Sequence, residues 1–134
     1  MNEVALEYFT KLLAEYKDTL GAGQYAAVSE VLRSIENGSS ADTLYGYISD
    51  DGENSIAHHA ENAEDTAVRT FFQALLSVTA CLVCAAYRSE GRKYLPEDIE
   101  SIDEDKLDGF FDFLRGSSPS AEACFDYFCR NVCV

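Results

Sequence analysis

The stretch FFQALLSVTACLVCAAY, Phe71–Tyr87, is the longest apolar run in the chain and decides its fold. Arg69 and Arg88 flank the run, polar side chains interrupt it three times, and it falls short of the roughly 20 apolar residues that span a membrane. Its apolar residues recur every three or four positions, which is the spacing of a helix with a buried face. We therefore predict a long, buried central helix over about 64-90 and no membrane span.

The same spacing of apolar residues predicts helices before the central one. The first covers Asn2–Leu20 and ends at the glycines of GAG, and the second begins near Tyr25 and ends at Asn37-Gly38. A short third helix begins with Ser39 as its N-cap and Asp42 three residues later. The next segment, IAHHAENAED, is either a weak helix of its own or the first turn of the central helix.

Helices are also predicted after the central one. Ser101 as N-cap and Glu104 three residues later indicate a helix that ends at Arg115-Gly116, and a last helix is expected over Ala121–Val132. No segment alternates apolar and polar residues between turn signals, so strand content should be near zero. The predicted fold is all-α, a single compact bundle of about six helices around the central helix, with one domain over residues 1-134.

The acidic side chains are concentrated in two segments. The chain has 24 acidic and 10 basic residues, a formal net charge of -14, and the 47% hydrophobic content of an ordinary globular protein. No Lys or Arg lies between Arg33 and Arg69, and only Lys106 lies between Glu97 and Asp108. The acids of the two segments are Glu36, Asp42, Asp50, Asp51, Glu53, Glu61, Glu64, Asp65, Glu97, Asp98, Glu100, Asp103, Glu104, Asp105 and Asp108. These segments carry the whole net charge, because the charges of the rest of the chain cancel.

Localised negative charge indicates which partners the protein binds. An acidic surface repels nucleic acid and anionic membranes, and it attracts basic proteins at rates that depend on ionic strength. We therefore expect a basic protein partner, no nucleic acid and no membrane.

The start of the chain and its cysteines favour a cytoplasmic protein. Glu3 and Glu7 stand where a secretory signal needs positive charge, so we expect no export. Five cysteines is an odd number, and reduced thiols are expected in the cytoplasm. Cys81 and Cys84 have the CxxC spacing of zinc and redox sites, but they lie in the middle of a helix rather than on a turn or at a helix N-terminus. We interpret all five cysteines as core residues.

No motif for catalysis, metal binding or a cofactor is present. His58 and His59 are adjacent, so on a helix they point about 100° apart and cannot form the i, i+4 pair that chelates zinc. Neither acidic segment matches an EF-hand loop, and no phosphate-binding loop or nucleophile elbow is found. We therefore predict no catalytic, cofactor-binding or metal-binding residue and no enzyme activity. The histidines are interpreted as exposed polar residues, with room for one of them to pack on the core.

Aromatic side chains beside the acids suggest an interface instead. Tyr45 and Tyr47 lie in LYGYISDDGEN, and exposed rings can anchor a partner that charge steers into place. The alternative is that both rings are half-buried in the core, and Tyr45 fits the apolar stripe of its helix better than Tyr47. Part of the second acidic segment, residues 101-105, also serves as a helix start, where the helix dipole favours carboxylates. The predicted partner-binding residues are Tyr47, Asp50, Asp51, Glu53, Glu97, Asp98, Glu100, Asp103 and Asp105.

The segment Ala41–Leu114 resembles the bacterial immunity-protein family numbered six, which is found beside polymorphic and contact-dependent toxins. The matching stretches are DTLYGYISDD, AENAEDTA, AAYRSEGRKYLPEDIESIDED and FFDFL, and KYLPEDIESIDED, Lys93–Asp105, is the most specific. The resemblance implies an all-helical protein that binds and neutralises a cognate toxin made by the same cell or its kin. The chain departs from the family pattern in lacking Trp around the central helix, where Phe71, Phe72 or Tyr87 can fill those places.

Three functions are open at this point. The leading hypothesis is a non-catalytic immunity protein whose acidic surface covers the nucleic-acid-binding cleft of a basic, nuclease-type toxin domain. The second is an acidic DNA mimic that inhibits a restriction or defence protein, although a mimic should spread its carboxylates along an elongated surface. The third is a small hydrolase or metal enzyme that uses His58, His59 and the acids.

Overall fold

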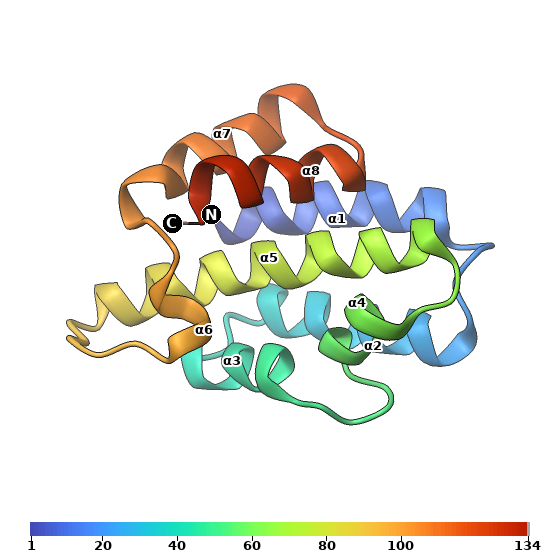
Figure 1. Ribbon diagram of the computed structural model, residues 1–134, viewed down its shortest axis with the longest axis horizontal. Coiled ribbons are helices and arrows are strands. Elements are labelled where there is room, and N and C mark those ends of the chain that lie inside the picture. Colours follow the sequence, from blue (N-terminus) through green and yellow to red (C-terminus); the bar gives the residue numbers. More distant parts are fainter. Residues whose placement is uncertain (134) are drawn as a thin grey trace.

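The computed structural model describes residues 1–133 as an assembly of helices (Figure 1). Within these residues there is no strand, and Ile102 and Cys133 form an isolated antiparallel bridge. A 3-10 turn, η1, and a π-helical turn, η2, complete the secondary structure. The elements are α1 Asn2–Tyr16, α2 Ala22–Glu36, α3 Ala41–Ser49, α4 Ile56–Asn62, α5 Thr66–Ser89, α6 Glu97–Glu100, η1 Glu104–Lys106, α7 Leu107–Ser117, α8 Ala121–Tyr127 and η2 Phe128–Val132. The all-α prediction is confirmed, and the described residues form eight α-helices rather than about six.

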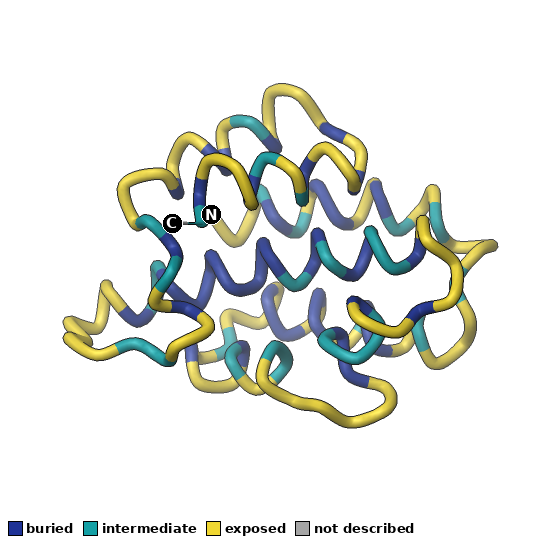
Figure 2. The backbone as a smooth tube through the Cα atoms, in the orientation of Figure 1, coloured by how far each residue is buried: buried dark blue, intermediate teal, exposed yellow. Residues whose placement is uncertain are grey.

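Helix α5 is the centre of the molecule, as the sequence predicted. It runs between α1, α7 and α8 on one side and α2, α3 and α4 on the other (Figure 1). Buried residues concentrate along it, and exposed residues lie on the outer helices and loops (Figure 2). By length and composition α5 could cross a membrane, but 72% of its most apolar window is buried inside this fold. It is therefore the core helix of the bundle.

The polar residues that interrupt α5 are satisfied within the helix. The Ser77 hydroxyl donates to the carbonyl of Gln73 at 2.8 Å, and the Thr79 hydroxyl donates to the carbonyl of Leu75 at 2.7 Å. Because these hydroxyls need no water, Ser77 and Thr79 can be buried without a desolvation penalty for a missing partner.

Side-chain caps set several helix starts. Asp65 caps α5, its Oδ1 accepting the backbone N–H of Ala67 at 2.8 Å, so the helix begins two residues later than expected. The third helix is capped by Ser40, which accepts the N–H of Thr43, and not by Ser39 as predicted. Segment 56–62 is a separate helix, α4, because Ser55 caps it.

The second acidic segment folds differently from the prediction. The residues before Ser101 form a single helical turn, α6, because Ile99 and Ile102, three positions apart, are both buried. Ser101 is the C-cap of α6 and not the N-cap of the next helix, and its hydroxyl lies 3.6 Å from Cys133 Sγ. The cap is instead Asp103, whose Oδ1 accepts the N–H of Asp105 at 3.0 Å and starts η1.

The ends of the last two helices, α7 and α8, also differ from the prediction. Helix α7 continues through Gly116 to Ser117, and Ser118 adopts a left-handed conformation with φ of 40° that ends it. The predicted helix over 121–132 is divided into α8 and the wider turn η2. This wider turn buries Val132, whose carbonyl accepts the N–H of Asp103 at 2.9 Å and joins the C-terminus to the second acidic segment.

Candidate functional site

Tyr45 joins the two acidic segments in space. It lies on α3, half-buried, and its hydroxyl donates a hydrogen bond to Asp98 Oδ1 on α6 at 3.1 Å. Its ring packs near Tyr87 of α5, with 6.2 Å between the ring centroids. Burial and the neighbouring Asp98 raise the pKa of Tyr45, so the hydroxyl keeps the proton that it donates. The contact places α6 beside α3, although 53 residues separate the two side chains in sequence.

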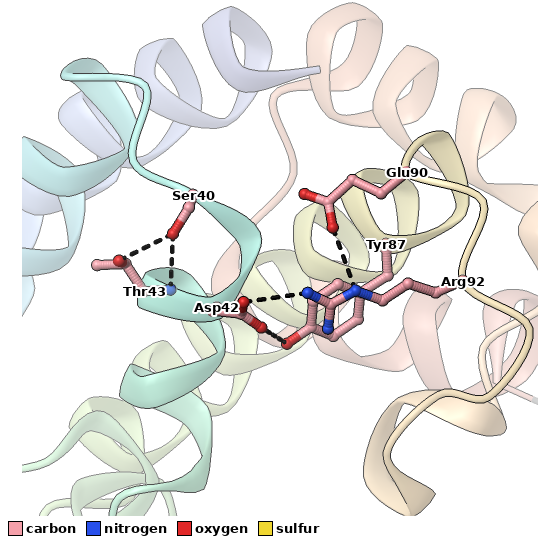
Figure 3. Close-up of polar contacts among 6 residues, drawn as sticks. All are labelled: Ser40, Asp42, Thr43, Tyr87, Glu90 and Arg92. Carbon is pink, nitrogen blue, oxygen red and sulfur yellow. Dashed lines mark hydrogen bonds and ion pairs between the residues drawn. The ribbon is translucent and has the colours of Figure 1, made fainter.

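Asp42 ties the start of α3 to the end of α5 (Figure 3). Its carboxylate accepts a hydrogen bond from the Tyr87 hydroxyl at 2.9 Å and pairs with the Arg92 guanidinium at 3.0 Å. The guanidinium also lies over the Tyr87 ring, 4.0 Å from its centroid, and pairs with Glu90 at 3.2 Å. Hydrogen bonds from Arg92 and then Tyr87 hold the pKa of Asp42 below its usual value. The negative charge of Asp42 is therefore balanced by Arg92 of the same chain.

Three predicted acids lie on the exposed loop between α3 and α4. Asp50 Oδ1 accepts the backbone N–H of Gly52 at 2.9 Å, which fixes the turn after α3. Asp51 and Glu53 are exposed, and none of the three loop acids forms an ion pair within residues 1–133. Their negative charges are available to a partner.

The acids of α6 are exposed because the single turn buries only Ile99. Glu97, Asp98 and Glu100 all lie in its first turn, where the dipole favours them, so they have the local explanation that the predicted loop lacked. In the part of the chain that the structure describes, no Lys or Arg pairs with these acids. We use the name acidic surface for the loop and α6 acids together, Asp50, Asp51, Glu53, Glu97, Asp98 and Glu100.

The remaining predicted acids have unequal surroundings. Asp103 is half-buried, and its carboxylate is engaged as the cap of η1. Glu104 forms an ion pair with Arg88 of α5 at 3.3 Å. Asp105 is exposed. The structure therefore gives Asp103 and Glu104 structural roles and leaves the Asp105 carboxylate facing solvent.

Two tyrosines other than Tyr45 lie beside these acids. Tyr47 is half-buried and packs against the core, so only part of its ring can meet a partner. Tyr94, in the segment between α5 and α6, is 92% exposed. Sequence reasoning missed Tyr94, although its place two residues before Pro96 and three before Glu97 indicated a loop beside acids. An exposed aromatic ring at this position is a candidate anchor for a partner.

The two histidines are packed side chains of α4. His59 lies against Phe72 of α5, with 4.9 Å between the ring centroids, while His58 contacts Asn62 one turn later. Burial, with a smaller contribution from His58, lowers the pKa of His59. The prediction that one histidine packs on the core is confirmed, but the other is half-buried rather than exposed. Within residues 1–133, no group of three His, Cys, Asp or Glu side chains could hold a metal ion.

The cysteines divide into buried and accessible thiols. Cys81, Cys84 and Cys124 are buried in the core, as predicted, and burial raises the pKa of Cys124 to about 12. Cys129 is exposed and Cys133 is half-buried, so the prediction of five core cysteines is wrong for these two. Both follow α8 on the π-helical turn or directly after it, which the prediction of one regular helix did not anticipate.

The chain was also compared with known protein families and with solved structures. Residues 6–116 match the family model described as immunity protein Imm6, and the match includes α5 and both acidic segments. No curated protein and no solved structure matches the chain. The match confirms the resemblance inferred from KYLPEDIESIDED, and the family is non-enzymatic. The chain belongs to the Imm6 immunity protein family.

Proposed function

We propose that this immunity protein neutralises a basic, nuclease-type toxin domain in the cytoplasm by covering its nucleic-acid-binding cleft. Family membership implies neutralisation of a cognate toxin, and the proposal adds the chemistry of the contact. A cleft that binds phosphates is lined with Lys and Arg, so a cluster of carboxylates can occupy it in place of the substrate.

One observation carries the proposal: six exposed acids that form no ion pair among residues 1–133 are gathered in two short stretches, the loop after α3 and α6, which contain no Lys or Arg. Asp42 and Glu104 are matched by arginines, and Asp65 and Asp103 cap helical turns. In the described part of the chain, the acids of the acidic surface form no ion pair. Asp50 accepts only the N–H of Gly52, and Asp98 accepts the hydroxyl of Tyr45, which joins α6 to α3, the helix that leads into the loop. Unpaired charges at an interface raise the association rate and select a partner of opposite charge.

The proposal is tested by co-expressing the protein with the toxin domain encoded beside it and measuring cell survival. The test variant reverses the six charges of the acidic surface to Lys. We expect it to lose protection, because the reversed surface repels a basic domain.

A matched control reverses six other exposed acids and has the same formal charge. It changes Glu3, Glu7, Glu15, Asp18, Glu30 and Glu36, which lie on α1, α2 and the segment between them. Protection should survive in this control, because its acidic surface is intact. Protection that survives in the test variant, or is lost equally in both variants, would contradict the acidic-surface mechanism.

A further inference from the structure

One side of α5 is left partly uncovered between its neighbours. Three of its half-exposed positions, Thr70, Gln73 and Leu76, form a helical stripe, and the buried Ala80 continues the same face one turn later. Figure 2 shows α5 on this side of the molecule, between α8 and the α3 and α4 pair. With 1.5 Å of rise per residue, the stripe from Thr70 to Ala80 is about 15 Å long.

Two hollows follow this stripe and form one groove. The first, of about 250 Å³, has Leu76 and Ala80 at its floor and Ile48 of α3 and Phe128 of η2 at its walls. The second, of about 330 Å³, continues toward the start of α5 over Gln73 and Thr70. Phe125 of α8 lines both hollows, so we treat them together as the α5 groove.

The first hollow of the α5 groove is mainly apolar, whereas the second is lined largely by polar and acidic side chains. Leu76, Ile48 and Phe125 are half-buried side chains that pack on the core and still reach the groove. Burying such side chains under a partner is favourable by roughly 25 cal/mol per Å² of apolar surface. The first hollow therefore offers apolar surface that a partner can cover.

The charged side chains that line the groove in the described residues are acidic. Asp98 of α6 lines one hollow, and Glu122 and Asp126 of α8 line the other. Among residues 1–133, no Lys or Arg lines either hollow. Asp126 is paired with Arg130 at 2.9 Å, which leaves Asp98 and Glu122 as the groove acids without an ion pair in the described residues. Asp98 also belongs to the acidic surface. The groove therefore joins the acidic surface, through Asp98, to an apolar hollow and to a more polar hollow beyond it.

We infer that the α5 groove takes a cationic, amphipathic segment of the cognate toxin, with apolar side chains on the floor and Lys or Arg against Asp98 and Glu122. This inference rests on the proposed function and adds a second, apolar part to the interface. Charge complementarity selects this occupant: a second copy of this chain, at -14, would bring like charges against the acidic side chains that line the groove. Apolar anchors would hold the complex together, while the charges guide its formation.

The first test measures toxin affinity in the double variant Leu76→Gln and Phe125→Gln. Gln preserves the helical propensity of Leu at position 76, and both changes remove apolar groups from the groove without altering charge. We expect the dissociation constant for the neighbouring toxin domain to rise about tenfold or more, as for the loss of central apolar anchors.

The matched control is Leu13→Gln on α1, a half-buried leucine that lines neither hollow. It should bind the toxin like the wild type. The midpoints of thermal unfolding show whether each variant is folded at the assay temperature. If the folded double variant binds as tightly as the control, the groove proposal is overturned.

Cys129 supplies a second readout in the unmodified protein. Its exposed thiol lines the α5 groove, whereas Cys81, Cys84 and Cys124 are buried. We expect saturating toxin to slow maleimide labelling of Cys129 by at least about tenfold, because an occupant covers the thiol. Mass spectrometry of the labelled peptides separates Cys129 from the half-buried Cys133.

The outcomes separate this inference from the proposed function. One outcome is that toxin binding is abolished by the six charge reversals, while toxin does not slow the labelling of Cys129 in the wild type. That outcome would overturn the groove proposal and leave the acidic-surface proposal intact. Protection of Cys129 that depends on the concentration of the free protein, without toxin, would assign the groove to a second copy and also overturn the inference. If the wild type binds no neighbouring toxin domain, the proposed function fails and the groove proposal fails with it.

Discussion

At the scale of single residues, a few polar side chains decide how the helices are joined. Tyr87 is 1% exposed, yet its hydroxyl reaches Asp42 and its ring supports Arg92. The hydroxyl of Tyr45 joins α3 to α6 by its hydrogen bond to Asp98. His59 has no such contact, since its Nε2 is buried and has no hydrogen-bond partner within residues 1–133. These residues are where stability should respond to substitution and pH.

The Tyr87→Phe variant should be less stable than the wild type by about 1 kcal/mol, the typical net worth of one hydrogen bond. The ring packing is kept, and Asp42 still has Arg92 as a partner. Denaturant unfolding at neutral pH measures the difference. The matched control, Tyr94→Phe, changes an exposed hydroxyl and should stay within about 0.5 kcal/mol of the wild type. Equal effects of the two changes would show that the contact between Tyr87 and Asp42 contributes nothing.

Stability should fall as the pH drops below 6.5, the ordinary pKa of histidine, because the pKa of His59 is lowered in the folded protein. In that range the unfolded chain binds the proton more readily than the folded protein, so protonation favours unfolding. The contribution is fully present above 6.5 and is lost as the pH falls toward the lowered pKa. Denaturant unfolding at several pH values measures this slope. His59→Phe, which can keep the packing on Phe72, should have a smaller slope, and an unchanged slope would assign the effect to other groups.

At the scale of elements, apolar spacing predicted most of the helices, and capping decided where they begin. The run Phe71–Tyr87 was sufficient to predict α5, because a long periodic apolar stretch between charged residues has few other solutions. The starts were predicted less well. Ser39, with Asp42 three residues later, has the capping-box spacing in the sequence, but it is Ser40 that accepts the N–H of Thr43 in the structure.

The second acidic segment was harder to predict for a physical reason. Ser101 and Glu104 have the spacing of a capping box, yet the burial of Ile99 and Ile102 outweighs that local preference. A separate turn forms before Ser101, and the next helical turn begins at a later cap, Asp103. The contact between Tyr45 and Asp98 and the α5 groove depend on which helices pack together. The spacing of residues within one segment does not specify how segments pack. The sequence therefore identified the acids of the two segments, but not which of them lie near one another in the fold.

The capping role of Asp103 leads to a prediction about stability. Asp103→Ala should destabilise the protein by about 1 kcal/mol, as for the loss of other caps, because the Asp105 N–H loses its partner. The control Asp105→Ala removes an exposed acid two residues away and should have an effect within about 0.5 kcal/mol. Chemical denaturation compares the two variants. An Asp103→Ala protein of unchanged stability but weaker toxin binding would place Asp103 in the interface instead.

At the scale of the whole molecule, the fold separates charge used for structure from charge left for a partner. Four arginines form ion pairs with acids, and Asp65 and Asp103 cap helical turns. The acidic surface lies on α6 and the loop after α3, at one end of the α5 groove through Asp98. A net charge of -14 acts at long range, while the apolar surface of the groove acts only on contact. The two parts should therefore affect different steps of binding: the acidic surface the association rate, and the groove the dissociation rate.

The most direct test of the acidic-surface mechanism is the association rate constant for the neighbouring toxin domain, measured by stopped flow at increasing salt. We expect the rate constant to fall at least about tenfold between low salt and about 0.5 M salt, because screening removes the attraction between the acidic surface and a basic cleft. The six-reversal variant should lose that dependence, and the control variant with the same formal charge should keep most of it. An association rate constant that is the same at low and high salt would contradict the mechanism.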